Sequence, residues 1–125
     1  MPEATVAVYR GEFTFDLEAL DAVILARWPA RRYVEIRAGR RAETLAGQYQ
    51  VMGDDGTPLQ VDVERTGKAL DLSASDSALA ADFIAAVTTL PGFPDDGSAI
   101  VAEWTDDIIA LRPQTPASEL LARLD

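Results

Sequence analysis

Residues 32–73 alternate apolar and polar side chains in four short stretches, with turn signals such as GDDGTP between them. Alternation with a period of two sends successive side chains to opposite faces of a strand. Short connections rich in Gly, Asp and Pro join strands that pair antiparallel. This region therefore predicts an antiparallel meander with one buried face and one face in water. The predicted strands cover 32–38, 48–52, 59–65 and 68–73.

The alternation also indicates which side chains share a face. Leu59, Val61 and Val63 fall on one side of their strand, and Leu70 and Leu72 fall on one side of the next. We expect both sets to point into the core, because a shift by one residue would expose all of them. In 32–38 the β-branched residues Val34 and Ile36 share one side, and the other side carries Tyr33, Glu35 and Arg37.

Two longer stretches have apolar residues at helical spacing. The first, 16–28, has acidic residues early and is stopped by Pro29. The second, 77–90, follows Ser75 or Asp76, either of which can cap a helix. Their apolar stripes are Leu17, Leu20, Val23, Ile24 and Trp28 in the first and Leu79, Phe83, Ala86, Val87 and Leu90 in the second.

Three further strands and a last helix complete the pattern. The strands cover 4–10, 99–104 and 108–112. Thr115 followed by Pro116 is typical of an N-cap and a proline at the first helical position, so a short C-terminal helix begins there.

The predicted order over residues 1–125 is β-α-β-β-β-β-α-β-β-α, within a single α+β domain. Two helices long enough to cover a sheet with one polar face imply a two-layer sandwich. We expect a mainly antiparallel sheet of six to seven strands. The helices 16–28 and 77–90 would cover its apolar face, and the opposite face would be open to solvent or to a partner.

The absence of histidine and cysteine removes most catalytic chemistry. Ser-His-Asp triads, cysteine nucleophiles and thiolate zinc sites are excluded. A serine nucleophile would need Lys68, the only lysine, to activate it, but Lys68 does not stand in a Ser-x-x-Lys motif. No glycine-rich phosphate-binding loop occurs in the sequence either. A glycosidase that uses carboxylates alone would need a deep cleft, which a small two-layer domain seldom provides. We therefore expect a protein that is not an enzyme, with no cofactor and no metal.

The net charge is −10, with 21 acidic and 11 basic residues. Such a surface repels nucleic acids and anionic membranes and attracts basic proteins. An arginine-rich stretch, 27–41, admits a nucleic-acid interpretation, but only Trp28 and Tyr33 accompany it. We favour the interpretation that these arginines lie at the C-terminus of a helix and on the solvent side of the following strand and turn. With neither a long apolar run nor a secretory signal pattern, we expect a cytoplasmic protein.

Three Asp-Asp pairs lie in predicted turns or loops. They are Asp54-Asp55, Asp95-Asp96 and Asp106-Asp107. Aspartate is common in turns because it bonds its own backbone, and this interpretation is favoured. An acidic rim that binds a protein is compatible with it. A metal site is the third alternative, but no calcium-loop spacing is matched.

Trp104 has two alternative placements. If Ala99 and Val101 face the core, Trp104 points outward and becomes an interface anchor beside aspartates. If Ile100 and Ala102 face the core, Trp104 is buried with them. The alternation of side chains along the strand does not distinguish these two placements, because the strand is apolar on both sides.

The segment ALDLSASDSALAADFIAAVTTLP, with its Leu79-Ala80-Ala81-Asp82-Phe83 helix start, resembles segments of small acidic actinobacterial proteins. Several of those look like immunity proteins of polymorphic-toxin systems. The likeness covers about residues 59–112 and is one of pattern, so no functional residue is carried over. It implies that the chain binds and neutralises a cognate toxin.

The sequence thus predicts a binding module that occludes a basic toxin, with no nucleic-acid or membrane partner. The expected contact residues are Asp54, Asp55, Asp95, Asp96, Trp104, Asp106 and Asp107. An assembly subunit that forms a homodimer through the open sheet face is the alternative.

Overall fold

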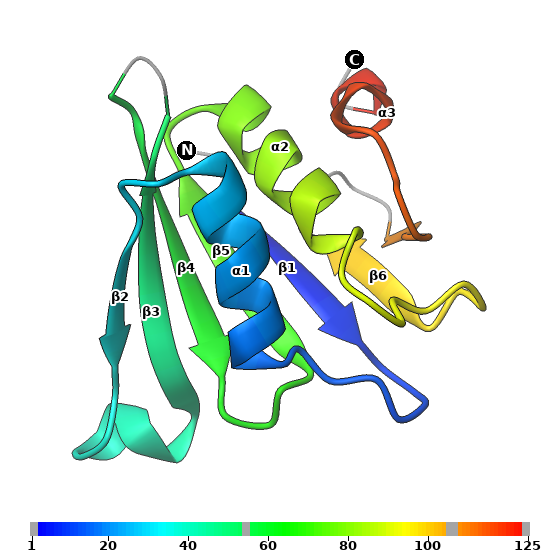
Figure 1. The fold of residues 1–125 in the computed structure, drawn as a ribbon. Coiled ribbons are helices and arrows are strands. Elements are labelled where there is room, and N and C mark those ends of the chain that lie inside the picture. Colours follow the sequence, from blue (N-terminus) through cyan, green and yellow to red (C-terminus); the bar gives the residue numbers. More distant parts are fainter. Residues whose placement is uncertain (1–2, 54–55, 105–107, 124–125) are drawn as a thin grey trace.

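The computed structural model describes residues 3–53, 56–104 and 108–123, and it contains one antiparallel sheet in the order β2-β3-β4-β5-β1-β6-β7 (Figure 1). The strands are β1 (Glu3–Val8), β2 (Arg32–Glu35), β3 (Leu45–Met52), β4 (Pro58–Glu64), β5 (Ala69–Ala74), β6 (Ala99–Ala102) and β7 (Ile109–Ala110). The helices are α1 (Leu17–Arg27), α2 (Ser77–Val87) and α3 (Ala117–Ala122), with a 3-10 turn η1 (Arg40–Glu43).

The helices lie on one face of this sheet (Figure 1). α1 and α2 cross that face, and α3 packs against α2. The predicted α+β fold, with two helices on the apolar face and a short C-terminal helix, is confirmed. The opposite face of the sheet carries none of the three helices.

Both long helices start at an aspartate. The Asp16 carboxylate accepts a hydrogen bond from the N–H of Ala19, and the Asp76 carboxylate accepts one from the N–H of Ala78. These side chains satisfy N–H groups that the first helical turn leaves without a partner. Of the two predicted caps for α2, Asp76 is therefore the one used.

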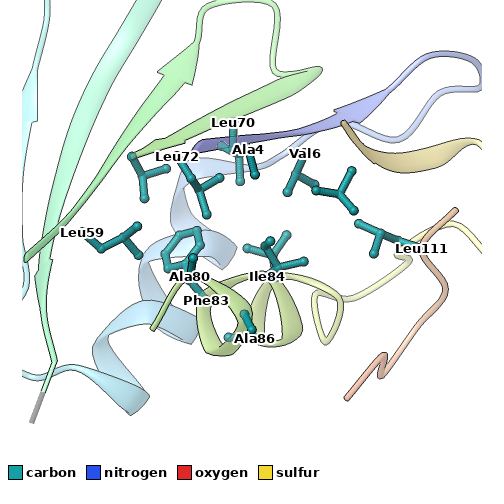
Figure 2. Close-up of a cluster of buried hydrophobic side chains, with 14 of the residues drawn as sticks. Ala4, Val6, Leu59, Leu70, Leu72, Ala80, Phe83, Ile84, Ala86 and Leu111 are labelled. Carbon is teal, nitrogen blue, oxygen red and sulfur yellow. The ribbon is translucent and has the colours of Figure 1, made fainter. Parts of the chain in front are cut away.

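The core lies between the sheet and the helix layer. Phe83 and Ile84, on the sheet side of α2, face Leu59, Leu72 and Val6 of the strands (Figure 2). The Phe83 ring stacks on Trp28 at the end of α1, with ring centroids 5.8 Å apart. The predicted core side chains of β4 and β5 are all buried: Leu59, Val61, Val63, Leu70 and Leu72.

The core-facing side of β2 is the one that carries Tyr33, whereas Val34 is exposed. Tyr33 pairs with Tyr49 across the strands, with ring centroids 4.6 Å apart. Its ring lies over Gly47, where an added Cβ would clash with the Tyr33 ring and hydroxyl. The missing side chain of Gly47 thus makes room for an aromatic ring on the core side.

The predicted N-cap at Thr115 is wrong, because α3 begins after Pro116 without a side-chain cap. Thr115 is buried instead. Its hydroxyl accepts from the N–H of Arg112 and donates to the Arg112 carbonyl, and its own N–H donates to the Thr88 hydroxyl. These bonds join the turn before α3 to the end of α2.

Candidate functional site

The face of the sheet opposite the helices is acidic at its centre. The outward side chains of β4 and β5 include Asp62, Glu64 and Asp71. Asp62 and Asp71 stand directly opposite each other in the antiparallel pair, and Glu64 is hydrogen-bonded to Asp71. We call these three residues the acidic triad. Neighbouring like charges on adjacent strands are destabilising unless a counter-charge compensates them.

Neutral groups hold two members of the acidic triad, Asp62 and Asp71, in place. Gln48 and Gln60 donate to one carboxylate oxygen of Asp62, at 2.8 and 3.3 Å, and the Thr5 hydroxyl donates to Asp71 at 2.9 Å. Strands β1, β4, β5 and β6 contain no lysine or arginine. Among the described residues, no basic side chain forms a salt bridge with the triad. The negative charge is therefore not neutralised within the described part of the chain.

The pKa of Glu64 is raised, first by burial and then by its hydrogen bond to Asp71 and the charge of that residue. A hydrogen bond between two carboxyl groups needs one proton between them. Above the raised pKa this proton is lost and the two groups repel each other. A cation placed at the triad would relieve that repulsion.

Replacing Glu64 by glutamine should stabilise the protein at pH 7, by up to about 1 kcal/mol. Since the pKa of Glu64 is higher in the folded than in the unfolded chain, the wild type gains stability as the pH falls through the raised pKa toward 4.5. The advantage of Glu64→Gln should be complete above that window and shrink within it. Urea denaturation at several pH values measures both effects.

The matched control is Glu12→Gln, which removes one charge at an exposed carboxylate outside the sheet. An equal gain in this control would mean that net charge alone, rather than the Glu64–Asp71 contact, sets the effect.

A hollow of about 190 Å³ adjoins the triad. Its acidic lining consists of Asp62, Asp71, Glu3 and Glu103, and no basic residue lines it. Glu103 directly follows β6 and has a φ of 64°, a left-handed conformation that non-glycine residues seldom adopt. A second hollow, of about 280 Å³, also borders Gln60. This second hollow is more apolar and is lined by Met52 and Pro58 among others.

Of the predicted aspartate pairs, the structure describes Asp95 and Asp96, which are exposed. The Asp96 carboxylate accepts from the N–H of Ser98 at 3.0 Å, and its backbone carbonyl accepts from Arg10 at 2.7 Å. The bonds from Ser98 hold the pKa of Asp96 below its usual value. Asp96 thus has the turn role that was favoured. The other two pairs, Asp54-Asp55 and Asp106-Asp107, lie outside the described residues.

Trp104 is buried, with 5% of its surface exposed. Its indole N–H donates to the carbonyl of Leu120 in α3 at 2.9 Å. Ala99 and Val101 face the core as well. In a regular strand Trp104 would then point to the opposite face, but the left-handed backbone of Glu103 breaks the alternation and turns Trp104 back toward the core. Trp104 therefore belongs to the core and is not retained as an interface anchor.

Several basic side chains make contacts within the fold. The Lys68 ammonium donates to the carbonyls of Gly11 and Phe13, at 2.9 and 2.7 Å. Arg65 donates to the carbonyl of Ile36 at 2.9 Å and to that of Leu45 at 3.2 Å. Each of these side chains holds a loop against the sheet.

Three arginines of the 27–41 stretch pair with carboxylates. Arg27 lies 3.9 Å from Asp82, and Arg37 lies 2.8 Å from Glu35. Arg31 forms two hydrogen bonds of 3.0 Å with the Asp21 carboxylate. These contacts agree with the interpretation of the stretch as a helix end and a solvent-facing strand.

Asp21 is the centre of a polar cluster between α1 and β3. It accepts the two bonds from Arg31 and a third, at 3.2 Å, from the buried hydroxyl of Tyr49. The Arg31 guanidinium is the main cause that lowers the pKa of Asp21. Burial, together with the Asp21 charge, raises the pKa of Tyr49. This cluster satisfies its own charges and fastens α1 to the sheet.

A cleft of about 390 Å³ lies where α1 ends and α2 begins. Its charged lining consists of Arg27, Asp76 and Asp82. Asp76 already caps α2 and Asp82 already faces Arg27. The uncovered sheet face is therefore the stronger candidate.

Because Asp62 and Glu64 alternate with Leu59, Val61 and Val63, the sequence predicts them on the solvent side of the strand, but it does not distinguish them from other outward polar residues. The signal was present, because Thr66-Gly67 joins two strands that both carry outward carboxylates. Only the register, which pairs Asp62 with Asp71, brings these groups together.

Within residues 3–53, 56–104 and 108–123, no group of three or more His, Cys, Asp or Glu side chains could hold a metal ion. None of the helices in those ranges has the length and apolar character that crossing a membrane requires. Comparison with known proteins found no matching family model, no matching curated protein and no matching solved structure.

Proposed function

We propose that this chain is a non-catalytic protein-binding module that neutralises a basic toxin domain by occluding it, as an immunity protein does. The observation that carries the proposal is the acidic triad on an uncovered sheet face, with no basic side chain on β1, β4, β5 or β6. A partner that brings lysine or arginine to this face supplies the missing counter-charge. The toxin's basic cleft would then be covered.

The acidic surface would act mainly on the rate of association. Complementary charge steers two proteins together, and salt screens the attraction. The exposed aspartates Asp95 and Asp96, with Asp54, Asp55, Asp106 and Asp107, stay candidates for this steering role. Raising NaCl from about 50 to about 500 mM should slow association at least about tenfold.

The test is affinity purification of the chain from its native host, followed by mass spectrometry of the co-eluting proteins. We expect a basic partner in a stoichiometric amount. Expression of that partner alone should arrest growth, and co-expression of this chain should restore it. Growth arrest that persists on co-expression would refute the proposal. So would elution of this chain alone at a mass above 13.5 kDa, which would favour a self-assembling subunit.

A further inference from the structure

β1 runs through the uncovered face, and after Glu3 at its start its outward side chains are short. Thr5 and Ala7 point to this side, as do Ser73 of neighbouring β5 and Ala102 of neighbouring β6. Short side chains allow the backbone of another protein to come close. Along β1 the side chains therefore project only a short distance from the sheet.

The outward side chains on the two sides of β1 differ in chemistry. On the β4–β5 side stand the carboxylates of the acidic triad, Asp62, Glu64 and Asp71. On the β6–β7 side the outward residues are Ile100 and Ala110, and Ile108, which is 67% exposed, precedes β7. β5 and β6 are separated by β1 alone, so their outward side chains lie about 10 Å apart.

We propose that this face docks a basic amphipathic helix of the partner protein, with its lysine or arginine side over β4 and β5 and its apolar side over β6 and β7. This inference rests on the proposed function and specifies the surface and the partner element. A helix is about 10 Å across, so a helix lying over β1 can reach the outward side chains of β5 on one side and of β6 on the other. The hollow lined by Glu3, Asp62, Asp71 and Glu103 receives one cationic side chain.

Charge argues against a second copy of this chain as the occupant. Each copy carries a net charge of −10, and its strands β1, β4, β5 and β6 hold no basic residue. Two such faces in contact would place the triad of one copy against carboxylates or alkyl groups of the other, and neither arrangement neutralises it. A basic partner compensates the triad, as the complementarity of known interfaces requires.

The test titrates the isotope-labelled full chain with a probe helix and follows the backbone amide signals by NMR. The probe is a capped peptide of about 18 residues, long enough to be helical, with lysines on one side and leucines on the other. We expect shift changes to gather in β1, β4, β5 and β6. The double variant Asp62→Asn/Asp71→Asn should raise the Kd for the probe at least tenfold.

The matched control is Glu12→Gln/Glu18→Gln, which removes two charges at exposed carboxylates outside the sheet. Its Kd should stay within about twofold of the wild type, because exposed charges remote from a contact contribute little. An equal loss of affinity in both double variants would overturn the inference, since net charge alone would then explain binding. Shift changes that gather on α1 and α2, or a probe that does not bind, would overturn it too.

The docking face and the proposed function fail in different ways. If the chain protects cells from its partner and Asp62→Asn/Asp71→Asn protects them equally well, the docking face is wrong and the function stands. If the probe binds at the face as expected but the chain protects against no partner, the function is wrong and the docking face stands. Thermal melting of both double variants confirms that they fold.

Discussion

Replacing Phe83 by alanine should lower the free energy of unfolding by about 3–5 kcal/mol. The Phe83 side chain has no exposed surface and stacks on Trp28. It thus joins α2 to the end of α1 as well as to the sheet. Alanine at this position would leave a cavity between the layers that neighbouring side chains can fill only in part. Urea denaturation followed by circular dichroism measures the loss.

The control for Phe83→Ala is Leu25→Ala in α1. Leu25 is 43% exposed, and alanine is the better helix former, so the change should stay within about 0.5 kcal/mol. A loss of less than about 1 kcal/mol for Phe83→Ala would contradict the packing of the two helices described above.

Replacing Trp104 by alanine should also cost about 3–5 kcal/mol, because the indole ring fills the core beside α3. Trp104→Phe keeps much of the ring volume but loses the hydrogen bond to the Leu120 carbonyl. Since that carbonyl also accepts from the N–H of Arg123, the cost of this bond should be about 1 kcal/mol. Denaturant titration of the two variants separates packing from hydrogen bonding.

The same variants distinguish a core role for Trp104 from an anchor role. A core tryptophan lowers stability when it is removed, whereas an exposed anchor lowers affinity and leaves stability nearly unchanged. If Trp104→Ala unfolded at the same urea concentration as the wild type, the buried position would be wrong.

The strands and helices were predictable because local pattern determines them. Leu59, Val61 and Val63 alternate with polar residues, and Asp16 and Asp76 stand where helix N-terminal N–H groups need acceptors. In these segments the local signal and the packing agree.

The placement of Trp104 was not predictable from alternation. Both sides of the strand before it are apolar, and the left-handed backbone of Glu103 is a feature that no residue pattern announces. The Thr115 cap failed for a related reason. Its hydroxyl has a better-placed partner in the Arg112 backbone than in the next helix.

The candidate site was predictable in part. That one sheet face would be uncovered and polar followed from alternation in 59–65, but the acidic triad depends on which strands are neighbours and in what register. Sheet order is set by packing of the whole chain, and here it inserts β1 between β5 and β6.

The position of β1 inside the sheet affects the order in which the strands can pair during synthesis. This strand is synthesised before both of its neighbours, since β5 begins at Ala69 and β6 at Ala99. During synthesis it has no strand partner until the chain has reached β5 at Ala69, and the sheet is complete only when the long loops between β1 and its neighbours have closed. Without β1 the sheet would fall into two pieces, β2-β3-β4-β5 and β6-β7. β1 is thus made before both of its neighbours but can pair with them only after they have been made.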